Sequence, residues 1–204
     1  MCEAGLFDLE KHFAFYGAYH KNPINVLIHT LFVWPIVFFT LVILHFVPPL
    51  LNLSHIGFIP SGFLDDRGLV LNLGFFLTIV YALFYICLDK KAGSLAALLC
   101  LACWVGGSSL AARLGFSLAW KVVLAAQLFC WTGQFLGHGL FEKRAPALLD
   151  NLVQAFVMAP LFVLLEVLQT CCGYEPYPGF HASVKAKIEA ELKELEDRKQ
   201  KKIS

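Results

Sequence analysis

The sequence predicts an all-α, polytopic integral membrane protein: a helix bundle with about four crossings, one re-entrant or interfacial helical segment and a C-terminal amphipathic helix. Two observations favour this fold class. Of the 204 residues, 58% are apolar and only 15% are charged. The apolar residues gather in five runs, each near the roughly 20 residues that a helix needs to cross a bilayer. Helix is the expected form because no run shows the period of a strand, and lipid excludes open sheet edges.

The predicted elements follow from these runs in order. The runs cover residues 26–51, 69–88, 93–112, 116–141 and 147–170. Between the first two, residues 54–68 contain glycines, a proline and two aspartates, which predicts a loop. The polar sequence Asp89-Lys90-Lys91 predicts a short turn. The tail from residue 182 predicts a helix on the membrane surface or against a partner helix, with one apolar face formed by Val184, Ile188, Leu192 and Leu195.

The distribution of lysine and arginine predicts the orientation. If the first four runs cross and the fifth does not, thirteen of the sixteen Lys and Arg share one side with both termini. If the fifth run also crosses, the split becomes six against ten. The positive-inside rule therefore favours an even number of crossings and cytosolic termini.

Two runs are candidates for the segment that does not cross. The fifth run contains polar residues and a proline, as expected of a re-entrant or interfacial segment: Asp150, Asn151, Gln154, Pro160, Glu166 and Gln169. Alternatively the first run, interrupted by Pro35 and by Pro48-Pro49, is the re-entrant one. Either choice leaves a membrane-embedded catalytic domain at residues 1–170 and a cytosolic helix and tail at 171–204.

The chain ends Lys201-Lys202-Ile203-Ser204, which resembles a dilysine retrieval signal of the endoplasmic reticulum. A cytosolic receptor reads such a signal, so it agrees with the predicted orientation. We expect a multi-pass protein of that membrane, in contact with lipid. The net charge of +1 and the lack of a basic groove give no indication of nucleic-acid binding.

Three histidines are predicted to reach the same membrane interface. His20 precedes the first run, His29 lies in its first turn, and His138 ends the fourth run on the cytosolic side. Glu142 follows His138 by four residues and therefore shares its helical face. Gly133 and Gly137 have the spacing that allows close helix approach, which would bring His138 near the first helix.

These residue types predict a metal site. Imidazoles with a carboxylate and no thiolate suit Fe(II), Zn or Mn, and ligands of this kind on Fe(II) leave positions open for substrate and O2. We therefore assign His20, His29 and His138 as catalytic metal ligands, with Glu142 as a further ligand. Polar groups that could orient the rings are Asn22, Asn25, Gln134, Asp150 and Asn151. Asp150 has the alternative role of a helix cap.

Other polar residues leave alternatives open. Lys143 and Arg144 are either topology determinants or the substrate-binding site for an anionic head group such as a lipid carboxylate. His45 lies about 24 Å from His29 on a straight helix, so it joins the site only if Pro35 folds the run back. His12, His55 and His181 are interpreted as solvated.

Two stretches resemble the signatures of a known family. They are residues 15–29, which read FYGAYHKNPINVLIH, and residues 137–148, which read GHGLFEKRAPAL and continue to Asp150, Asn151 and Gln154. Both are similar to segments of the endoplasmic reticulum 2-hydroxy fatty acid dioxygenases of fungal phytosphingosine breakdown. The resemblance covers about residues 7 to 170.

The resemblance implies Fe(II)-dependent α-oxidation. A 2-hydroxy long-chain fatty acid and O2 would give a fatty acid one carbon shorter and CO2, within sphingoid-base and fatty acid catabolism. It implies iron binding by His20, His29 and His138, with His45 as a candidate further ligand that would conflict with a straight first helix. Glu142 as a ligand rests on spacing. The competing hypothesis is a non-catalytic protein that shapes or scaffolds the membrane, with interfacial histidines as anchors. The sequence does not determine the oligomeric state.

Overall fold

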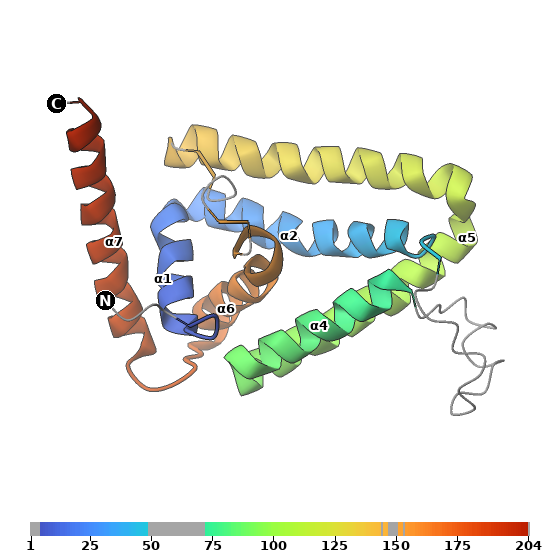
Figure 1. The fold of residues 1–204 in the computed structure, drawn as a ribbon, viewed down its shortest axis with the longest axis horizontal. Helices are drawn as coiled ribbons and strands as arrows, with labels where there is room; N and C mark the ends of the chain where they lie inside the picture. The colour runs from blue at the N-terminus through green and yellow to red at the C-terminus, as the bar shows by residue number, and fades with distance from the viewer. Residues whose placement is uncertain (1–4, 49–71, 144, 147–150, 153, 204) are drawn as a thin grey trace.

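The computed structural model describes residues 5–48, 72–143, 145–146, 151–152 and 154–203, without the side chains at 191 and 194–203. Within these ranges every regular element is a helix, which confirms the all-α class. Figure 1 shows the helices α1 (Leu9–Tyr19), α2 (Pro23–Leu44), α4 (Leu73–Leu88), α5 (Lys90–Leu136), α6 (Ala159–Cys172) and α7 (Phe180–Ile203). Two π-helical segments, η2 (Gly137–Glu142) and η4 (Gln154–Met158), flank the region that contains the site. The predicted loop at 54–68 lies outside the described residues.

The third and fourth predicted runs form one helical element with a sharp bend. Gly115 has φ 64° and ψ 161°, a backbone conformation that is open to glycine and costly for other residues. The bend divides α5 into two arms, of which the first lies beside α4 and the second returns beside α2 (Figure 1). Asp89 connects α4 to α5 alone, and its carboxylate caps α5 by accepting a 2.6 Å bond from the Ala92 amide. The predicted turn at this point is therefore confirmed.

Helix α2 is continuous from Pro23 to Leu44, with Pro35 inside it. Asn22 caps its start by accepting a 2.9 Å bond from the Ile24 amide, and Pro23 has no amide hydrogen to satisfy. Because the helix does not fold back at Pro35, His45 stands at its far end, where the carbonyl oxygen of His45 accepts a bond from Asn72. The alternative in which the first run is re-entrant at Pro35 is therefore wrong for the described part of that run.

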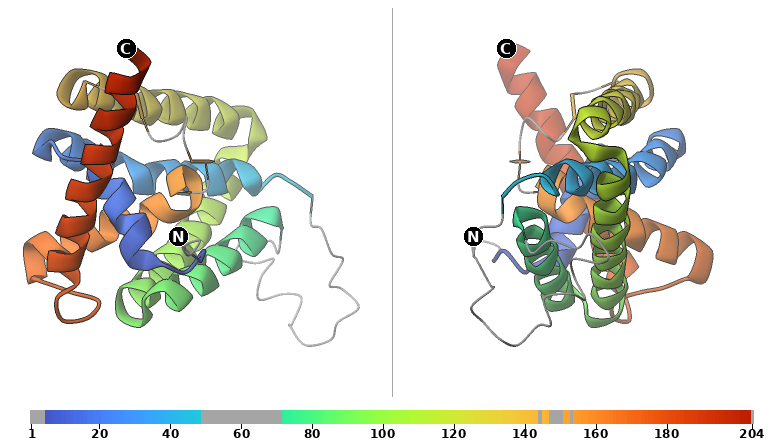
Figure 2. Two further views of the ribbon diagram at one scale, coloured as in Figure 1. Left: turned by 60° about the vertical axis from the view of Figure 1, so that its left-hand side comes forward. Right: turned by 90° about the vertical axis from the view of Figure 1, so that its right-hand side faces the viewer.

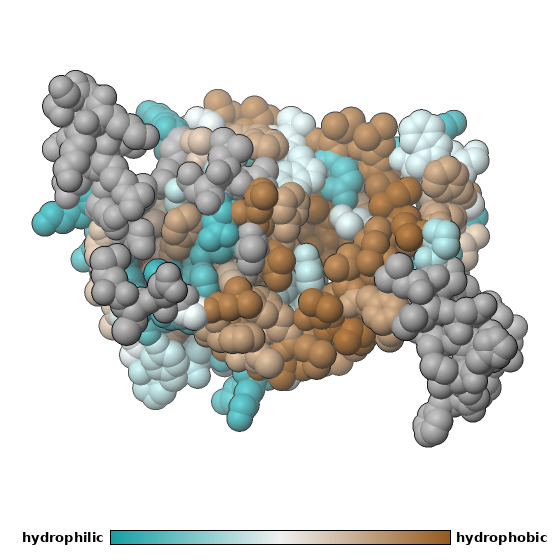
Figure 3. Space-filling view, in the orientation of Figure 1, coloured by the Kyte–Doolittle hydropathy of each residue, from teal (hydrophilic) through white to brown (hydrophobic). Residues whose placement is uncertain are grey.

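Three stretches are long and apolar enough to cross a membrane: Pro23–Leu44, Lys90–Glu142 and Gln154–Cys172. The second contains the bend at Gly115, and α4 is a shorter apolar helix of 16 residues. Large apolar side chains are exposed along α2, α4 and the second arm of α5, including Leu31, Leu83 and Phe129 at 57%, 60% and 68% exposure. Apolar residues cover much of the face over α4 (Figure 3). A surface of this kind is expected to contact lipid.

The C-terminal helix packs against the N-terminal one. Val184 and Phe180 of α7 are buried in the same cluster as Phe13 of α1, and Gly17 leaves room for Ile188. Figures 1 and 2 show α7 beside α1, with its C-terminal end pointing away from the bundle. Of the two predicted positions for the tail helix, the structure shows the one against another helix, and that helix is α1 of the same chain. The orientation of the chain, the domain division at 170 and the retrieval signal stay predictions.

Candidate metal centre

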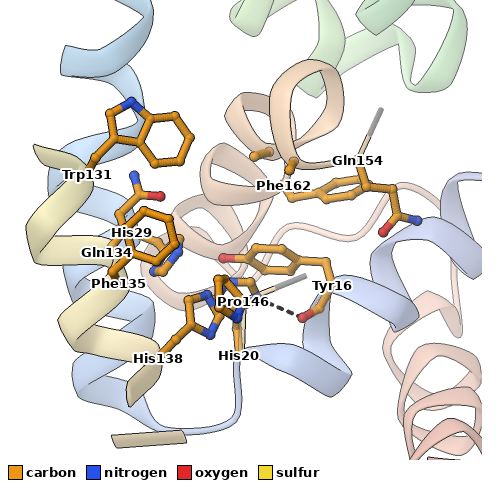
Figure 4. A pocket seen from close by; sticks show the side chains of 12 residues that line it. Tyr16, His20, His29, Trp131, Gln134, Phe135, His138, Pro146, Gln154 and Phe162 are labelled. Atoms are coloured by element: carbon orange, nitrogen blue, oxygen red, sulfur yellow. Dashed lines mark hydrogen bonds between the residues drawn. The ribbon is translucent and has the colours of Figure 1, made fainter. Parts of the chain in front are cut away.

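His20, His29 and His138 meet in one buried cluster. Their ring centroids lie 4.4 Å apart for His20 and His29, 4.8 Å for His20 and His138, and 4.9 Å for His29 and His138. One ligand atom from each lies within 4.8 Å of the others, and the three residues are 3–9% exposed. Each pair of rings is close to edge-on, with interplanar angles of 68–80°. Figure 4 shows the three side chains converging from separate elements.

Local structure explains why His20 and His29 are neighbours. Helix α1 ends at Tyr19 and His20 is its C-cap, with its amide bonded to the Gly17 carbonyl oxygen. After a connection of three residues, α2 begins at Pro23 and presents His29 in its second turn. The sharp change of direction between the two helices places the cap of one against the side of the next (Figure 1).

His138 is brought to this pair by close helix packing. A Cβ on Gly133 would lie 2.3 Å from the Phe32 ring, and one on Gly137 would lie 2.4 Å from Asn25 Oδ1. Only glycine allows α5 to approach α2 this closely, so the predicted role of this pair in packing is confirmed. His138 then sits in the π-helical turn η2, a geometry often found at functional sites.

Backbone carbonyls orient two of the three rings. His20 Nδ1 lies 2.8 Å from the carbonyl oxygen of Tyr16, and His29 Nδ1 lies 3.0 Å from that of Asn25. A carbonyl oxygen only accepts, so each Nδ1 must donate a proton and the lone pair of each neutral ring is on Nε2. A hydrogen bond of this kind sets the tautomer and orientation of histidine ligands in metal sites.

Glu142, which was predicted to be a metal ligand, lies outside the histidine cluster and binds amide groups instead. Its Oε1 accepts bonds of 2.8 Å from the backbone amides of Lys21 and Asn22, and one of 3.2 Å from Asn25 Nδ2. These amides belong to the connection between α1 and α2. The carboxylate thus joins η2 to the segment that holds His20 and His29. The ligand group includes only the three histidines, so metal ligation by Glu142 stays a prediction without support in this geometry.

Of the remaining predicted residues, some lie at the site and others lie outside it or outside the described residues. Asn25 and Gln134 are buried at the site, and Asn22 caps α2 next to it. Asn151 caps η4, where its Oδ1 accepts a 3.1 Å bond from the Gln154 amide, the capping role that was considered for Asp150. Lys143 ends η2 in the left-handed conformation, with φ 51° and an exposed side chain outside the pocket lining. Arg144 and Asp150 lie outside the described residues.

A pocket of roughly 580 Å³, open at its mouth, adjoins the three histidines. Its wall includes residues that the sequence did not single out as site residues, namely Tyr16, Trp131, Phe135, Pro146, Gln154, Ala155, Ala159 and Phe162. The Tyr16 ring stacks on the His20 ring at 4.0 Å between centroids. The sequence signals for Tyr16 were its place in the signature at residues 15–29 and its position four residues before His20, which lets its carbonyl oxygen reach that ring.

Two buried donors of this wall have no hydrogen-bond partner among the described residues: the Tyr16 hydroxyl and Gln134 Nε2. In Figure 4 the Tyr16 hydroxyl points toward the side of the pocket where His29 and Gln134 lie. Burial raises the pKa of Tyr16 well above its ordinary value of 10, so the hydroxyl keeps its proton. A buried donor without a partner is costly, so these two groups point to a polar ligand.

His12 differs from its predicted solvated state. It is half-buried, and its Nδ1 accepts a 2.8 Å bond from Gln154 Nε2. Burial lowers the pKa of His12 below 6.5, which keeps the ring neutral and able to accept. His181 is partly exposed and lies 3.5 Å from Glu175, and His55 is outside the described residues. His45, at the other end of α2, does not belong to the histidine cluster.

The fold and the site define a class: an all-helical protein of membrane type with a buried trio of imidazoles suited to a metal ion. Within that class, the chain belongs to the family described as 2-hydroxy-palmitic acid dioxygenase Mpo1-like, which it matches over residues 6–171. It is 37% identical over 188 residues to the 2-hydroxy-palmitic acid dioxygenase MPO1 of Saccharomyces cerevisiae, covering 92% of this chain and 91% of the relative. No solved structure matches the chain. The family inferred from the two signature segments is therefore confirmed.

Proposed function

We propose that this protein is an Fe(II)-dependent dioxygenase that shortens 2-hydroxy long-chain fatty acids by one carbon. The observation that supports this most directly is the cluster of His20, His29 and His138 in a chain so similar to a dioxygenase. The name of the yeast relative supplies the substrate class, and the buried imidazoles supply donors that suit Fe(II).

The residues present fit a resident iron. His20 and His29 would bind through Nε2, because Nδ1 of each ring is committed to a carbonyl oxygen. His138 would complete a set of three neutral ligands and leave room for substrate and O2 on the pocket side. Bound iron would supply the one-electron chemistry by which O2 reacts with an organic acid.

The proposed reaction balances without a further reductant. R–CH(OH)–COOH and O2 give R–COOH, CO2 and H2O. The bond between C1 and C2 breaks, a new bond from C2 to oxygen forms, and the acid supplies the four electrons that reduce O2. The protein therefore needs to bind, orient and shield the acid, and no second cosubstrate site is required.

The polar end of the substrate requires donors at the pocket. We assign this role to the Tyr16 hydroxyl and Gln134 Nε2, which are buried in its wall without partners among the described residues. Binding of the substrate carboxylate was one of two alternatives that the sequence left open for Lys143 and Arg144. Lys143 is exposed and does not line the pocket, so a role in drawing anionic substrates to the membrane surface suits it better.

Glu142 is proposed as a positioning residue. Its hydrogen bonds to Lys21 and Asn22 hold η2 against the α1–α2 connection, and so hold His138 against His20 and His29. Asn25 strengthens this connection. Its side-chain amide donates to Glu142, and its carbonyl oxygen accepts a hydrogen bond from His29 Nδ1.

We further propose that the protein resides in the endoplasmic reticulum membrane and acts in sphingoid-base and fatty acid catabolism. The apolar helices, the bias of Lys and Arg to one side and the C-terminal lysines support this location. The site would then open near the cytosolic face, where a carboxylate can remain hydrated until it enters the pocket.

The proposal is tested with the full chain purified in detergent and supplied with Fe(II) under anaerobic conditions. We expect bound iron by elemental analysis, and O2 uptake with release of the shortened acid when 2-hydroxypalmitic acid is added. His29→Ala should lose both. His45→Ala is the matched control, because it removes an imidazole at the opposite end of the same helix and should keep both. If the wild-type protein binds no iron and forms no shortened acid, the dioxygenase proposal is wrong and the scaffold hypothesis is favoured.

A further inference from the structure

A second hollow lies away from the histidines, between α2, α4 and the first arm of α5. Together with the open space at its mouth it measures about 520 Å³, and its lining consists of Ile36, Val37, Thr40, Leu41, Leu44, Leu77, Thr78, Tyr81, Cys100 and Phe156. It lies further along α2 toward His45 and shares no lining residue with the histidine pocket. The residues that the proposed reaction uses at its polar end do not reach it.

A third, smaller hollow lies between this one and the histidine pocket. It shares Trp131, Gln134 and Ala155 with the histidine pocket, and Ile36, Val37 and Phe156 with the distal hollow. The three hollows thus follow one another along α2, from His29 through Val33 to Leu44. Fifteen residues of helix separate His29 from Leu44, a path of about 22 Å. This is roughly the extended length of a palmitoyl chain.

The three hydroxyl groups that line the distal hollow already donate their hydrogens to backbone carbonyl oxygens, so none of them is left to donate to a ligand. Thr40 Oγ1 donates to the Ile36 carbonyl oxygen at 2.7 Å, and Thr78 Oγ1 donates to that of Gly74 at 2.8 Å. The Tyr81 hydroxyl donates to the Phe156 carbonyl oxygen at 3.1 Å. The lining is mainly apolar, with the buried Cys100 thiol beside it, and it contains no charged side chain, so it suits an alkyl chain better than a charged head group.

Neighbouring hollows are separated by the side chains that line both of them. Phe156 is one of them, and its ring contacts Trp131 at 5.8 Å between centroids. Its side chain is 48% exposed, so the ring can turn without opening a cavity in a packed core. Its backbone stays in place meanwhile, because Tyr81 and Tyr85 bond to the carbonyl oxygens of Phe156 and Val157.

We infer that these hollows form the acyl-chain site, and that the distal hollow receives the methyl end of the substrate. The inference rests on the proposed function for the identity of the ligand. It assigns chain-length selection to residues beside the distal hollow, of which Leu77 is the best placed for a test. Leu77 is only partly buried on α4, so a larger side chain there can fill the hollow without replacing a packed core residue.

The test compares Leu77→Trp with Leu83→Trp, the same substitution at a position of α4 that is 60% exposed and lines none of these hollows. The substrates are 2-hydroxy acids from 2-hydroxydecanoic to 2-hydroxystearic acid. We expect Leu77→Trp to lower kcat/KM for the longest acids by about tenfold and to leave the shortest nearly unchanged. Leu83→Trp should keep the wild-type profile. An unaltered profile in a folded Leu77→Trp protein overturns the acyl-chain site.

A binding measurement separates this inference from the proposed function. Displacement of a fluorescent fatty acid by the same series is followed in the metal-free protein, where no turnover is needed. A chain-length shift in Leu77→Trp supports the site even if no acid is ever oxidised. If Leu77→Trp fails to fold, Leu77→Ala enlarges the hollow and should move the preference toward longer acids. If no acid displaces the probe from the wild type, the hollows belong to membrane lipid and the inference fails.

Discussion

Glu142 Oε1 accepts a hydrogen bond of 2.8 Å from the backbone amide of Asn22, a residue 120 positions earlier in the chain. The same oxygen accepts from Lys21 and Asn25, so a single carboxylate joins the end of the long bent helix to the N-terminal connection. The three histidines come from these two parts of the chain. Their separation therefore depends on this contact as well as on the packing of α2 against α5.

We predict that Glu142→Ala will lower both stability and iron affinity. Loss of the charged acceptor leaves the buried Asn25 amide unsatisfied, and a hydrogen bond to a charged group contributes about 1.5–3 kcal/mol. Loss of a partner behind the ligands typically lowers metal affinity by about 10–100-fold. Thermal unfolding in detergent and iron titration measure the two effects.

Glu142→Gln distinguishes the positioning role from direct ligation. The amide oxygen of glutamine can still accept from the Lys21 and Asn22 amides, so we expect most of the iron affinity to remain. If Glu142 were itself a ligand, the substitution would replace an anionic donor with a neutral one. The absorption and magnetic spectra of the bound metal would then change, an outcome that contradicts the positioning role.

Tyr16→Phe should weaken binding of the polar end of the substrate while leaving the metal in place. The phenyl ring keeps the stacking contact with His20, and only the buried hydroxyl is removed. We expect KM for 2-hydroxy acids to rise by about tenfold, the effect of losing one hydrogen bond to a charged group, with iron content unchanged. Tyr177→Phe, far from the pocket on the segment before α7, is the control and should keep the wild-type KM. A Tyr16→Phe enzyme with normal KM would remove Tyr16 from the substrate site.

Gly137→Ala should separate the two halves of the site. Its Cβ would lie 2.4 Å from Asn25 Oδ1, so either the asparagine or the helix must move. Overpacking of this kind costs about 1–3 kcal/mol, and it should reduce iron affinity because His138 follows directly. Gly139→Ala is a matched control two residues away, where an added Cβ meets no atom within 4 Å. Equal losses in both variants would show that helix propensity, not close approach, is responsible.

The contact between α1 and α7 should be sensitive to acid. Hydrogen bonds from Lys187, Ser183 and Tyr177 lower the pKa of Glu10 from 4.5 to about 2. Because this pKa is depressed in the folded state, its stabilising effect is complete above pH 4.5 and is lost as the pH falls toward about 2. We expect faster amide exchange in α7 over that interval.

Glu10→Gln is the control for this transition. A glutamine cannot titrate, so the exchange rate of α7 should already be raised near neutral pH and should not change further over the interval from 4.5 to about 2. Persistence of the acid transition in Glu10→Gln would assign it to another carboxylate.

Much of the fold was predictable because its signals are local. Composition and short-range periodicity predicted the apolar runs, the turn at Asp89 and the apolar face that contains Val184 and Ile188. In the described residues the runs form helices, Asp89 separates two of them, and the apolar face packs against α1. The bend at Gly115 divides the third run from the fourth at the predicted place, although α5 continues as one helical element.

The site was predictable only in part. The histidines were found because imidazoles are unusual at the edge of an apolar run, and Glu142 was noticed because it follows His138 by one helical turn. Its actual partners, the amides of Lys21 and Asn22, lie far away in sequence and give no local signal. Tyr16, Trp131 and Phe162 look like ordinary apolar core residues until the pocket is present.

By itself, the sequence determined the helical membrane class, the family and the three histidines, because each depends on residue types and their spacing along the chain. The tertiary structure decided that His45 stands apart, that the Glu142 carboxylate binds backbone amides, and that Tyr16 lies against the histidine cluster. These features depend on whether α2 continues through Pro35 and on how closely α5 approaches it at Gly137. The spacing of Gly133 and Gly137 indicated a close approach, but the atoms of α2 that they meet lie far away in sequence and give no local signal.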